Sequence, residues 1–240
     1  MTEAAAPRRL AGRVAVVTGA SRGFGAAAAV AIASEGAHLI LVARTVGGLE
    51  QTDDAVRRAG GTATLVPLDL KEGERIDQLG AALHGRFGKL DMLVAAAGAL
   101  GSLTPVGHIR PEQWADVMAV NLTANWRLIR SLDPLLRLSD AGRAVFVSCA
   151  EATGREAYWA GYAVSKGGLE TLVRLYAAEL GNTAVRANIF DPGAMRTGLR
   201  AAAFPGEDPA SVPDPAEAAL GMLPLLMPDY PHQGQRIVFS

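Results

Sequence analysis

The stretch Thr18–Gly19–Ala20–Ser21–Arg22–Gly23–Phe24–Gly25 decides the fold class of this 240-residue chain. It follows the β-branched apolar run Val14–Thr18 and precedes an alanine-rich segment that we expect to be helical. Glycines at a strand-to-helix turn let the backbone approach a pyrophosphate, whose charge is stabilised at the helix N-terminus. Glycines also make ordinary turns, so it is the position between the first strand and the first helix that predicts a nucleotide site.

Short strand-like runs and longer helical stretches alternate along the rest of the chain. The expected strands are Val14–Thr18, His38–Val42, Thr62–Pro67, Met92–Ala95, Ala144–Ser148, Ala184–Ile189 and Arg236–Phe239. The expected helices are Gly25–Glu35, Gly47–Arg58, Arg75–Phe87, Pro111–Arg137, Tyr158–Leu180 and Pro215–Leu226. This alternation favours an α/β fold: a single doubly wound, Rossmann-type domain over residues 1–240, with a seven-stranded, mostly parallel sheet and helices on both faces. Residues 194–215, whose second half is rich in proline, glycine and acidic residues, are expected to form a substrate lid inside this domain.

A tyrosine and a lysine, Tyr162 and Lys166, stand four residues apart on a segment with helical periodicity. Positions i and i+4 of a helix lie on the same face, so the phenol and the ammonium group are expected to be neighbours. A nearby cation lowers a tyrosine pKa from its ordinary value of about 10. The pair would then serve as a general acid or base near neutral pH, although the same spacing also arises by chance.

The glycine turn and Tyr162–x–x–x–Lys166, in this order and at this separation, resemble the short-chain dehydrogenases/reductases over nearly the whole chain. The run of residues 196–209 is similar to a poorly characterised bacterial branch of that family. The resemblance implies hydride transfer between a nicotinamide dinucleotide and a small-molecule carbonyl or secondary alcohol. It assigns Tyr162 as the proton donor or acceptor and Lys166 as the residue that lowers its pKa and binds the nicotinamide ribose. Asn121 matches the helix asparagine that holds a proton path, or simply bonds a neighbouring backbone carbonyl.

The same resemblance places the cofactor contacts around the expected strand ends. Asp69 would accept a hydrogen bond from the adenine amine, and Thr197 would donate one to the nicotinamide carboxamide. The segment Ala95–Ala96–Ala97–Gly98 stands where the family usually carries Asn-Asn-Ala-Gly, so backbone packing must replace two polar side chains. The full set of expected cofactor contacts is Gly19, Ser21, Arg22, Gly23, Phe24, Gly25, Arg44, Asp69, Leu70, Ala97, Gly98, Tyr162, Lys166, Pro192, Gly193 and Thr197.

The end of the second expected strand bears on cofactor preference. An NAD site usually places an acidic residue there, whereas an arginine suits the 2′-phosphate of NADP. Here Ala43 and Arg44 supply no carboxylate and one guanidinium, and Arg22 supplies a second. We therefore predict a preference for NADP(H), with NAD(H) as the alternative if both arginines are only solvated surface side chains.

The sequence departs from the family pattern at the residue that orients the substrate. The family serine, thirteen residues before Tyr162, falls on Cys149, and Ser148 lies one residue away. Strand alternation should direct Cys149 toward the substrate, and a thiol donates a weaker hydrogen bond than a hydroxyl. Three readings stay open: a bulge brings Ser148 into play, Cys149 serves in a slow enzyme, or the chain is a regulatory or scaffold protein that binds cofactor without turnover.

Composition limits the classes of partner. Half of the residues are hydrophobic and the net charge is −1, which gives no reason to expect nucleic acid or an anionic membrane. The single cysteine fits a reducing cytoplasm, and neither it nor the four histidines shows metal-ligand spacing, so no metal site is expected. No apolar stretch has the length of a membrane span. The apolar surface of Pro111–Arg137 and Tyr158–Leu180, helices through which family members commonly assemble, predicts a homodimer or homotetramer.

Overall fold

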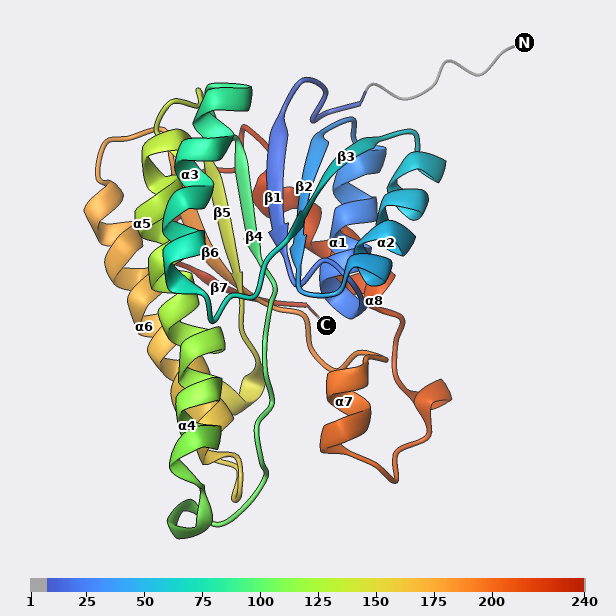
Figure 1. Ribbon diagram of the computed structural model, residues 1–240, viewed down its shortest axis with the longest axis vertical. Coiled ribbons are helices and arrows are strands. Elements are labelled where there is room, and N and C mark those ends of the chain that lie inside the picture. The colour runs from blue at the N-terminus through green and yellow to red at the C-terminus, as the bar shows by residue number, and fades with distance from the viewer. Residues whose placement is uncertain (1–7, 240) are drawn as a thin grey trace.

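The computed structural model describes residues 8–239 and is built around a seven-stranded sheet with strand order β3-β2-β1-β4-β5-β6-β7 (Figure 1). All six described strand pairings are parallel. Runs of apolar residues buried on both faces explain why the five inner segments form central parallel strands, whereas the two edge strands are only partly buried. The strands are β1 (Val14–Thr18), β2 (His38–Ala43), β3 (Thr62–Pro67), β4 (Met92–Ala95), β5 (Arg143–Val147), β6 (Arg186–Asp191) and β7 (Arg236–Val238).

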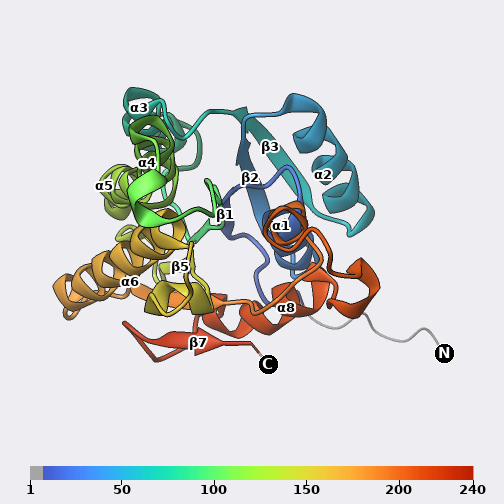
Figure 2. The same cartoon turned by 90° about the horizontal axis from the view of Figure 1, so that it is seen from below.

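Helices cover both faces of the sheet (Figure 2). An apolar core lies between the sheet and the helices on each face. One face packs against α1 (Gly23–Ser34), α2 (Val46–Arg58) and α8 (Pro215–Met222). The other face packs against α3 (Gly73–Phe87), α5 (Ala124–Leu136) and α6 (Ala160–Leu180). The predicted doubly wound, Rossmann-type α/β fold is thereby confirmed.

The long helix predicted over Pro111–Arg137 is wrong in one respect. The structure divides it into α4 (Pro111–Met118), a π-helical turn (Ala119–Thr123) and α5. A π turn inserts one extra residue into a helix and changes the direction of the side chains within it. The apolar residues keep a 3.6-residue spacing on both sides of the turn. The sequence pattern therefore does not reveal the extra residue. Strand β6 also begins at Arg186 rather than Ala184, because its pairing with β5 starts at Arg143↔Arg186.

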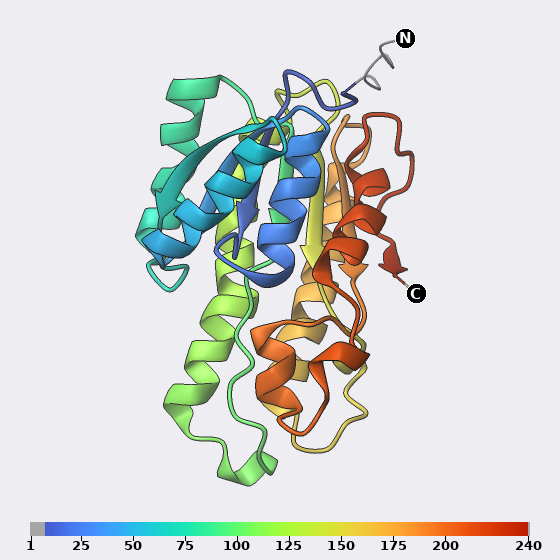
Figure 3. The same cartoon turned by 90° about the vertical axis from the view of Figure 1, so that its right-hand side faces the viewer.

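The carboxyl ends of the strands meet at one edge of the sheet, and two helical segments lie beyond that edge (Figures 1 and 3). One is α4, and the other is α7 (Gly198–Ala203), which lies within the predicted lid of residues 194–215. A short 3₁₀ turn (Pro209–Ser211) follows α7. Across residues 8–239, no helix combines the length and the apolar character that a membrane crossing requires.

Candidate active site

A cavity of about 1180 Å³ opens at the carboxyl ends of the strands. Its walls come from the glycine turn before α1, the ends of β2 to β6, the first turns of α6, and α7. Every residue predicted to contact a cofactor lines this cavity, and so does Cys149. Asn121 is the one predicted site residue that lies behind the wall, fully buried.

The glycine turn packs tightly against the end of β4. Gly19 has a φ of +67°, and a Cβ at this position would lie 2.8 Å from the Ala97 Cα. Such an approach excludes any side chain at Gly19 and favours a small residue at Ala97. The Ala97 amide donates a hydrogen bond of 3.2 Å to the Thr18 hydroxyl. A close backbone approach and one hydrogen bond to the Thr18 side chain therefore join β1 to the alanine-rich end of β4, where the sequence lacks the family's two asparagines.

Asn121 lies in the π turn and fixes the chain just beyond β4. Its amide oxygen accepts a hydrogen bond from the Ala99 amide at 2.8 Å, and its nitrogen donates to the Ala99 carbonyl at 2.9 Å. The same nitrogen donates to the Ser165 hydroxyl on α6 at 2.9 Å. A Cβ at Gly98 would lie 3.7 Å from Asn121 Oδ1 and 3.8 Å from Lys166 Nζ. Asn121 thus holds three segments together next to the lysine.

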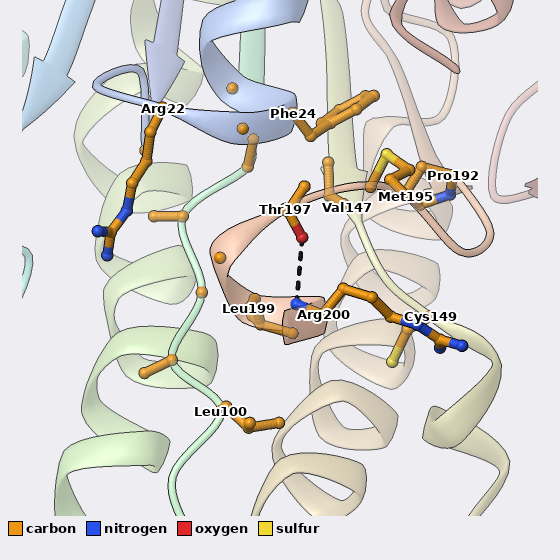
Figure 4. Close-up of a pocket in the computed structure, with 18 of the residues that line it drawn as sticks. Arg22, Phe24, Leu100, Val147, Cys149, Pro192, Met195, Thr197, Leu199 and Arg200 are labelled. Carbon is orange, nitrogen blue, oxygen red and sulfur yellow. Dashed lines mark hydrogen bonds between the residues drawn. The ribbon is translucent and has the colours of Figure 1, made fainter. Parts of the chain in front are cut away.

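Two exposed arginines lie at the mouth of the cavity, at the end where the glycine turn begins. Arg22 extends from that turn (Figure 4), and Arg44 follows β2. An Arg44 guanidinium nitrogen lies 3.9 Å from an Asp69 carboxylate oxygen, with the arginine side chain 64% exposed. An exposed pair at this distance is weak, so the Arg44 guanidinium remains available to another anion.

Tyr162 and Lys166 are both buried on the first two turns of α6. Lys166 Nζ donates a hydrogen bond of 2.8 Å to the Val147 carbonyl at the end of β5 and lies 5.9 Å from the Tyr162 ring centroid. Burial raises the pKa of the Tyr162 hydroxyl well above its ordinary value, and the neighbouring Cys149 and Glu151 act in the same direction. Burial therefore sets the net direction of the shift in this structure, and the expected lowering of the tyrosine pKa by Lys166 stays a prediction.

Ser148 and Cys149 follow β5 and have different surroundings. The Ser148 hydroxyl is buried and donates a hydrogen bond of 2.7 Å to Glu170 on α6. Cys149 lines the cavity (Figure 4) and neighbours Tyr162 and Lys166, as strand alternation predicts. Burial raises the pKa of the Cys149 thiol to about 12, so the thiol is neutral at physiological pH. A neutral thiol can donate a hydrogen bond but is a poor nucleophile.

Aromatic side chains lie at the end of the cavity near Tyr162 and α7. The Trp159 ring centroid lies 5.9 Å from that of Tyr162 and 5.8 Å from that of Phe204, which follows α7. The Arg200 guanidinium lies 3.7 Å from the Phe204 ring centroid and pairs with both carboxylate oxygens of Glu207, at 2.6 and 2.8 Å. The Trp159–Phe204 contact joins the end of α7 to the start of α6, and the Arg200 contacts lie within the segment that contains α7.

The segment that leads into α7 also reaches the glycine-turn end of the cavity. The Thr197 hydroxyl accepts a hydrogen bond of 3.2 Å from the Arg200 amide and so caps α7 (Figure 4). A Cβ at Gly23 would lie 3.3 Å from the Thr197 methyl group, so the start of α7 approaches the glycine turn. Sequence reasoning missed Arg200, and its only signal was an acidic partner seven residues later in the same lid.

Comparison with known proteins agrees with this geometry. The short chain dehydrogenase family model matches residues 13–208. The uncharacterized oxidoreductase YciK of Escherichia coli (strain K12) is 36% identical over 208 residues, which cover 85% of this chain and 82% of YciK. A short chain dehydrogenase structure from Pseudomonas syringae has a TM-score of 0.93 and 39% identity, covering 97% of this chain and 96% of that one.

A short chain dehydrogenase from Shigella flexneri 2a, solved in complex with NADP, has a TM-score of 0.92 and 34% identity. The match covers 96% of this chain and 98% of that one. Sequence, fold and cavity thus converge on one family. The chain belongs to the short-chain dehydrogenases/reductases, in a poorly characterised bacterial branch, and is an NAD(P)-dependent oxidoreductase.

Proposed function

We propose that the protein is an NADP(H)-dependent carbonyl reductase or secondary-alcohol dehydrogenase in which Tyr162 exchanges the proton. One observation carries the proposal: a single cavity extends from the glycine turn to the Tyr162 hydroxyl, with Lys166 buried beside the tyrosine. The set of lining residues suits a dinucleotide at one end and a small apolar substrate at the other.

The residues around the cavity fit a nicotinamide dinucleotide. The close-packed turn at Gly19 and the N-terminus of α1 offer backbone amides and a positive dipole end to a pyrophosphate. The Pro192–Gly193 loop and Thr197 would hold the nicotinamide, and Lys166 would hold its ribose. When bound, the nicotinamide supplies or accepts the hydride.

The chain itself would supply orientation and a proton. A neutral Tyr162 is the form that can donate a proton to a carbonyl oxygen, and its raised pKa maintains that form. Cys149, next to Tyr162 on the cavity wall, would donate its thiol hydrogen to the same oxygen. Trp159 and Phe204 would pack on the substrate and exclude water, which favours ring-bearing or otherwise apolar substrates.

Two observations support NADP(H) over NAD(H). Arg22 and Arg44 both line the cavity at the glycine-turn end, and Arg44 has only the weak contact with Asp69. Guanidinium groups bind phosphate oxygens through paired hydrogen bonds. The Shigella flexneri relative was solved in complex with NADP. The same dinucleotide is therefore the first one to test.

The proposal is tested by titrating NADPH into the protein by fluorescence and then screening ketones and aldehydes for loss of NADPH absorbance. We expect turnover of at least one carbonyl class. Tyr162→Phe should lower kcat by about a hundredfold to ten-thousandfold while NADPH still binds, because the variant removes only the proton donor. Binding without any turnover would overturn the proposal and favour a regulatory or scaffold protein.

We also propose a cytoplasmic homodimer or homotetramer. Trp126 on α5 and Val164 and Leu175 on α6 are large apolar side chains that are 45 to 58% exposed. A second copy of the chain could cover them, as the sequence resemblance implies. Light scattering at micromolar concentration should give the mass of at least two chains, and the mass of one chain would contradict the assembly.

A further inference from the structure

Arg236 on β7, the last strand of the sheet, reaches three segments that form or support the cavity. Its Nε donates a hydrogen bond of 3.0 Å to a carboxylate oxygen of Glu170. One terminal nitrogen donates at 2.6 Å to Asp191 Oδ2, and the same nitrogen donates at 3.2 Å to the Cys149 carbonyl. The side chain is 25% exposed, so most of it is enclosed by these partners.

Two of these acceptors, Cys149 and Asp191, belong to different walls of the cavity, and the third, Glu170, lies on α6 behind the wall. Cys149 lines the substrate end of the cavity after β5. Asp191 ends β6, and its second oxygen accepts a hydrogen bond of 3.0 Å from the Gly193 amide in the nicotinamide loop. Glu170 lies on α6 four residues after Lys166, hence on the same helix face. One guanidinium therefore joins the substrate wall, the nicotinamide wall and the acid–base helix.

The charges require a cation with the geometry of an arginine. Glu170 and Asp191 are 7% and 3% exposed, and both carboxylates contact Arg236. Buried carboxylates need a partner that satisfies their lone pairs as well as their charge. The planar guanidinium fork offers several donors in fixed directions, whereas a lysine offers one compact ammonium group. The fork still has a donor for the Cys149 carbonyl after it contacts both carboxylates, while Arg174 supplies a second cation to Glu170.

We propose that Arg236 is a positioning residue for hydride transfer. It holds Cys149 and the Pro192–Gly193 loop in register with Tyr162 on α6, so that the substrate carbonyl meets both the proton donor and the nicotinamide. A displacement of about 1 Å in such an arrangement can cost about a hundredfold in rate. The inference rests on the proposed reductase function for its kinetic consequence, but the positioning itself can be measured without turnover.

The sole cysteine of the sequence provides that measurement, because alkylation by iodoacetamide then reports on Cys149 alone. The variants are Arg236→Met, Arg236→Lys and, as a matched control, Arg174→Met. Arg174 donates a hydrogen bond of 2.7 Å to the other Glu170 oxygen and does not line the cavity. Arg236→Met should raise the alkylation rate about tenfold, because the structure around Cys149 should open locally more often. Arg236→Lys should give an intermediate alkylation rate. Arg174→Met should stay near the wild-type rate.

The kinetic arm uses NADPH and the best carbonyl found in the screen. Arg236→Met should lower kcat by about tenfold to a hundredfold, while the Kd for NADPH stays close to that of the wild type. Arg236→Lys should restore part of kcat, and Arg174→Met should retain nearly all of it. A lower kcat with an unchanged Kd for NADPH would indicate lost positioning. A general loss of stability would instead lower the Tm, which is measured for each variant.

Two results would overturn the inference. In the first, both Arg236 variants keep the wild-type rate of alkylation and the wild-type kcat. The other is an equal loss of kcat and Tm in Arg174→Met and Arg236→Met. If Arg236→Met does not fold, Arg236→Lys decides by the same two readouts. If the wild type reduces no carbonyl, the proposed function fails, and the alkylation rates still decide whether Arg236 holds Cys149.

Discussion

The Ser148 hydroxyl donates a hydrogen bond of 2.7 Å to the Glu170 carboxylate. Both side chains are buried, and Glu170 also accepts hydrogen bonds from Arg174 and Arg236. The hydroxyl of Ser148 is therefore committed to a network behind the cavity wall. Of the two candidates Ser148 and Cys149, which both line the cavity, Cys149 is the one whose polar hydrogen is not donated to Glu170.

Replacing the thiol with a hydroxyl should improve polarisation of the substrate carbonyl. We expect Cys149→Ser to raise kcat/KM for carbonyl reduction by about tenfold, the scale of one improved hydrogen bond. Steady-state kinetics with NADPH would measure it. Ser148→Ala is the matched control and should bring no increase, since its hydroxyl points to Glu170. An unchanged or lower rate in Cys149→Ser would mean that the thiol is adapted to the natural substrate.

Reversing the charge at the end of β2 should change the cofactor preference. Arg44→Asp should lower kcat/KM for NADPH by about tenfold to a hundredfold, because a charge-assisted contact with the 2′-phosphate is lost. The efficiency with NADH should rise relative to that with NADPH. Arg58→Asp, the same charge change on the exposed end of α2, should alter neither value. If wild-type protein uses NADH as well as NADPH, the preference for NADP(H) is wrong.

The two reaction directions should depend on pH in opposite ways. The raised pKa of Tyr162 keeps the phenol protonated from about pH 6 to pH 9. The kcat/KM for carbonyl reduction should therefore be nearly constant over this range. Reduction should fall only as the pH passes that raised pKa. Oxidation requires the phenolate and should increase with pH. Profiles of kcat/KM in both directions measure this, and a fall in reduction near neutral pH would contradict a raised tyrosine pKa.

The ion pair between Arg200 and Glu207 should hold the lid over the substrate. Both side chains are 26% exposed, so Glu207→Gln should weaken closure only moderately. We expect KM for the carbonyl to rise about twofold to fivefold, and trypsin to cleave faster after Arg200. Glu217→Gln on α8 removes an exposed carboxylate outside the lid and serves as the control. Equal proteolysis in both variants would show that the pair does not control the lid.

Local sequence signals predicted the parts of the site that are built from short segments. The glycine turn follows from one strand, one turn and one helix, and the Tyr162–Lys166 pair follows from helix periodicity alone. The contacts of Arg236 could not be predicted in this way. Its partners lie 45, 66 and 87 residues away along the chain, and only the completed sheet brings them together.

The effect of burial on the pKa of Tyr162 could not be predicted from the sequence for a related reason. The spacing to Lys166 indicates a favourable charge, but it carries no information about burial. In the structure the phenol is 7% exposed, and Lys166 Nζ is directed at the Val147 carbonyl. Desolvation depends on everything packed around the group, so a two-residue motif cannot supply its sign or size.

The π turn at Ala119–Thr123 has a consequence for how this protein tolerates deletions. Removing one residue from the turn would let α4 and α5 merge into one regular helix, which has better hydrogen-bond geometry. The same deletion would rotate Asn121 by about 100° around the helix axis. Its amide would then miss both Ala99 and Ser165. The π turn therefore makes the helix locally less stable but directs the Asn121 side chain toward Ala99 and Ser165. This one turn is a trade-off between stability and activity.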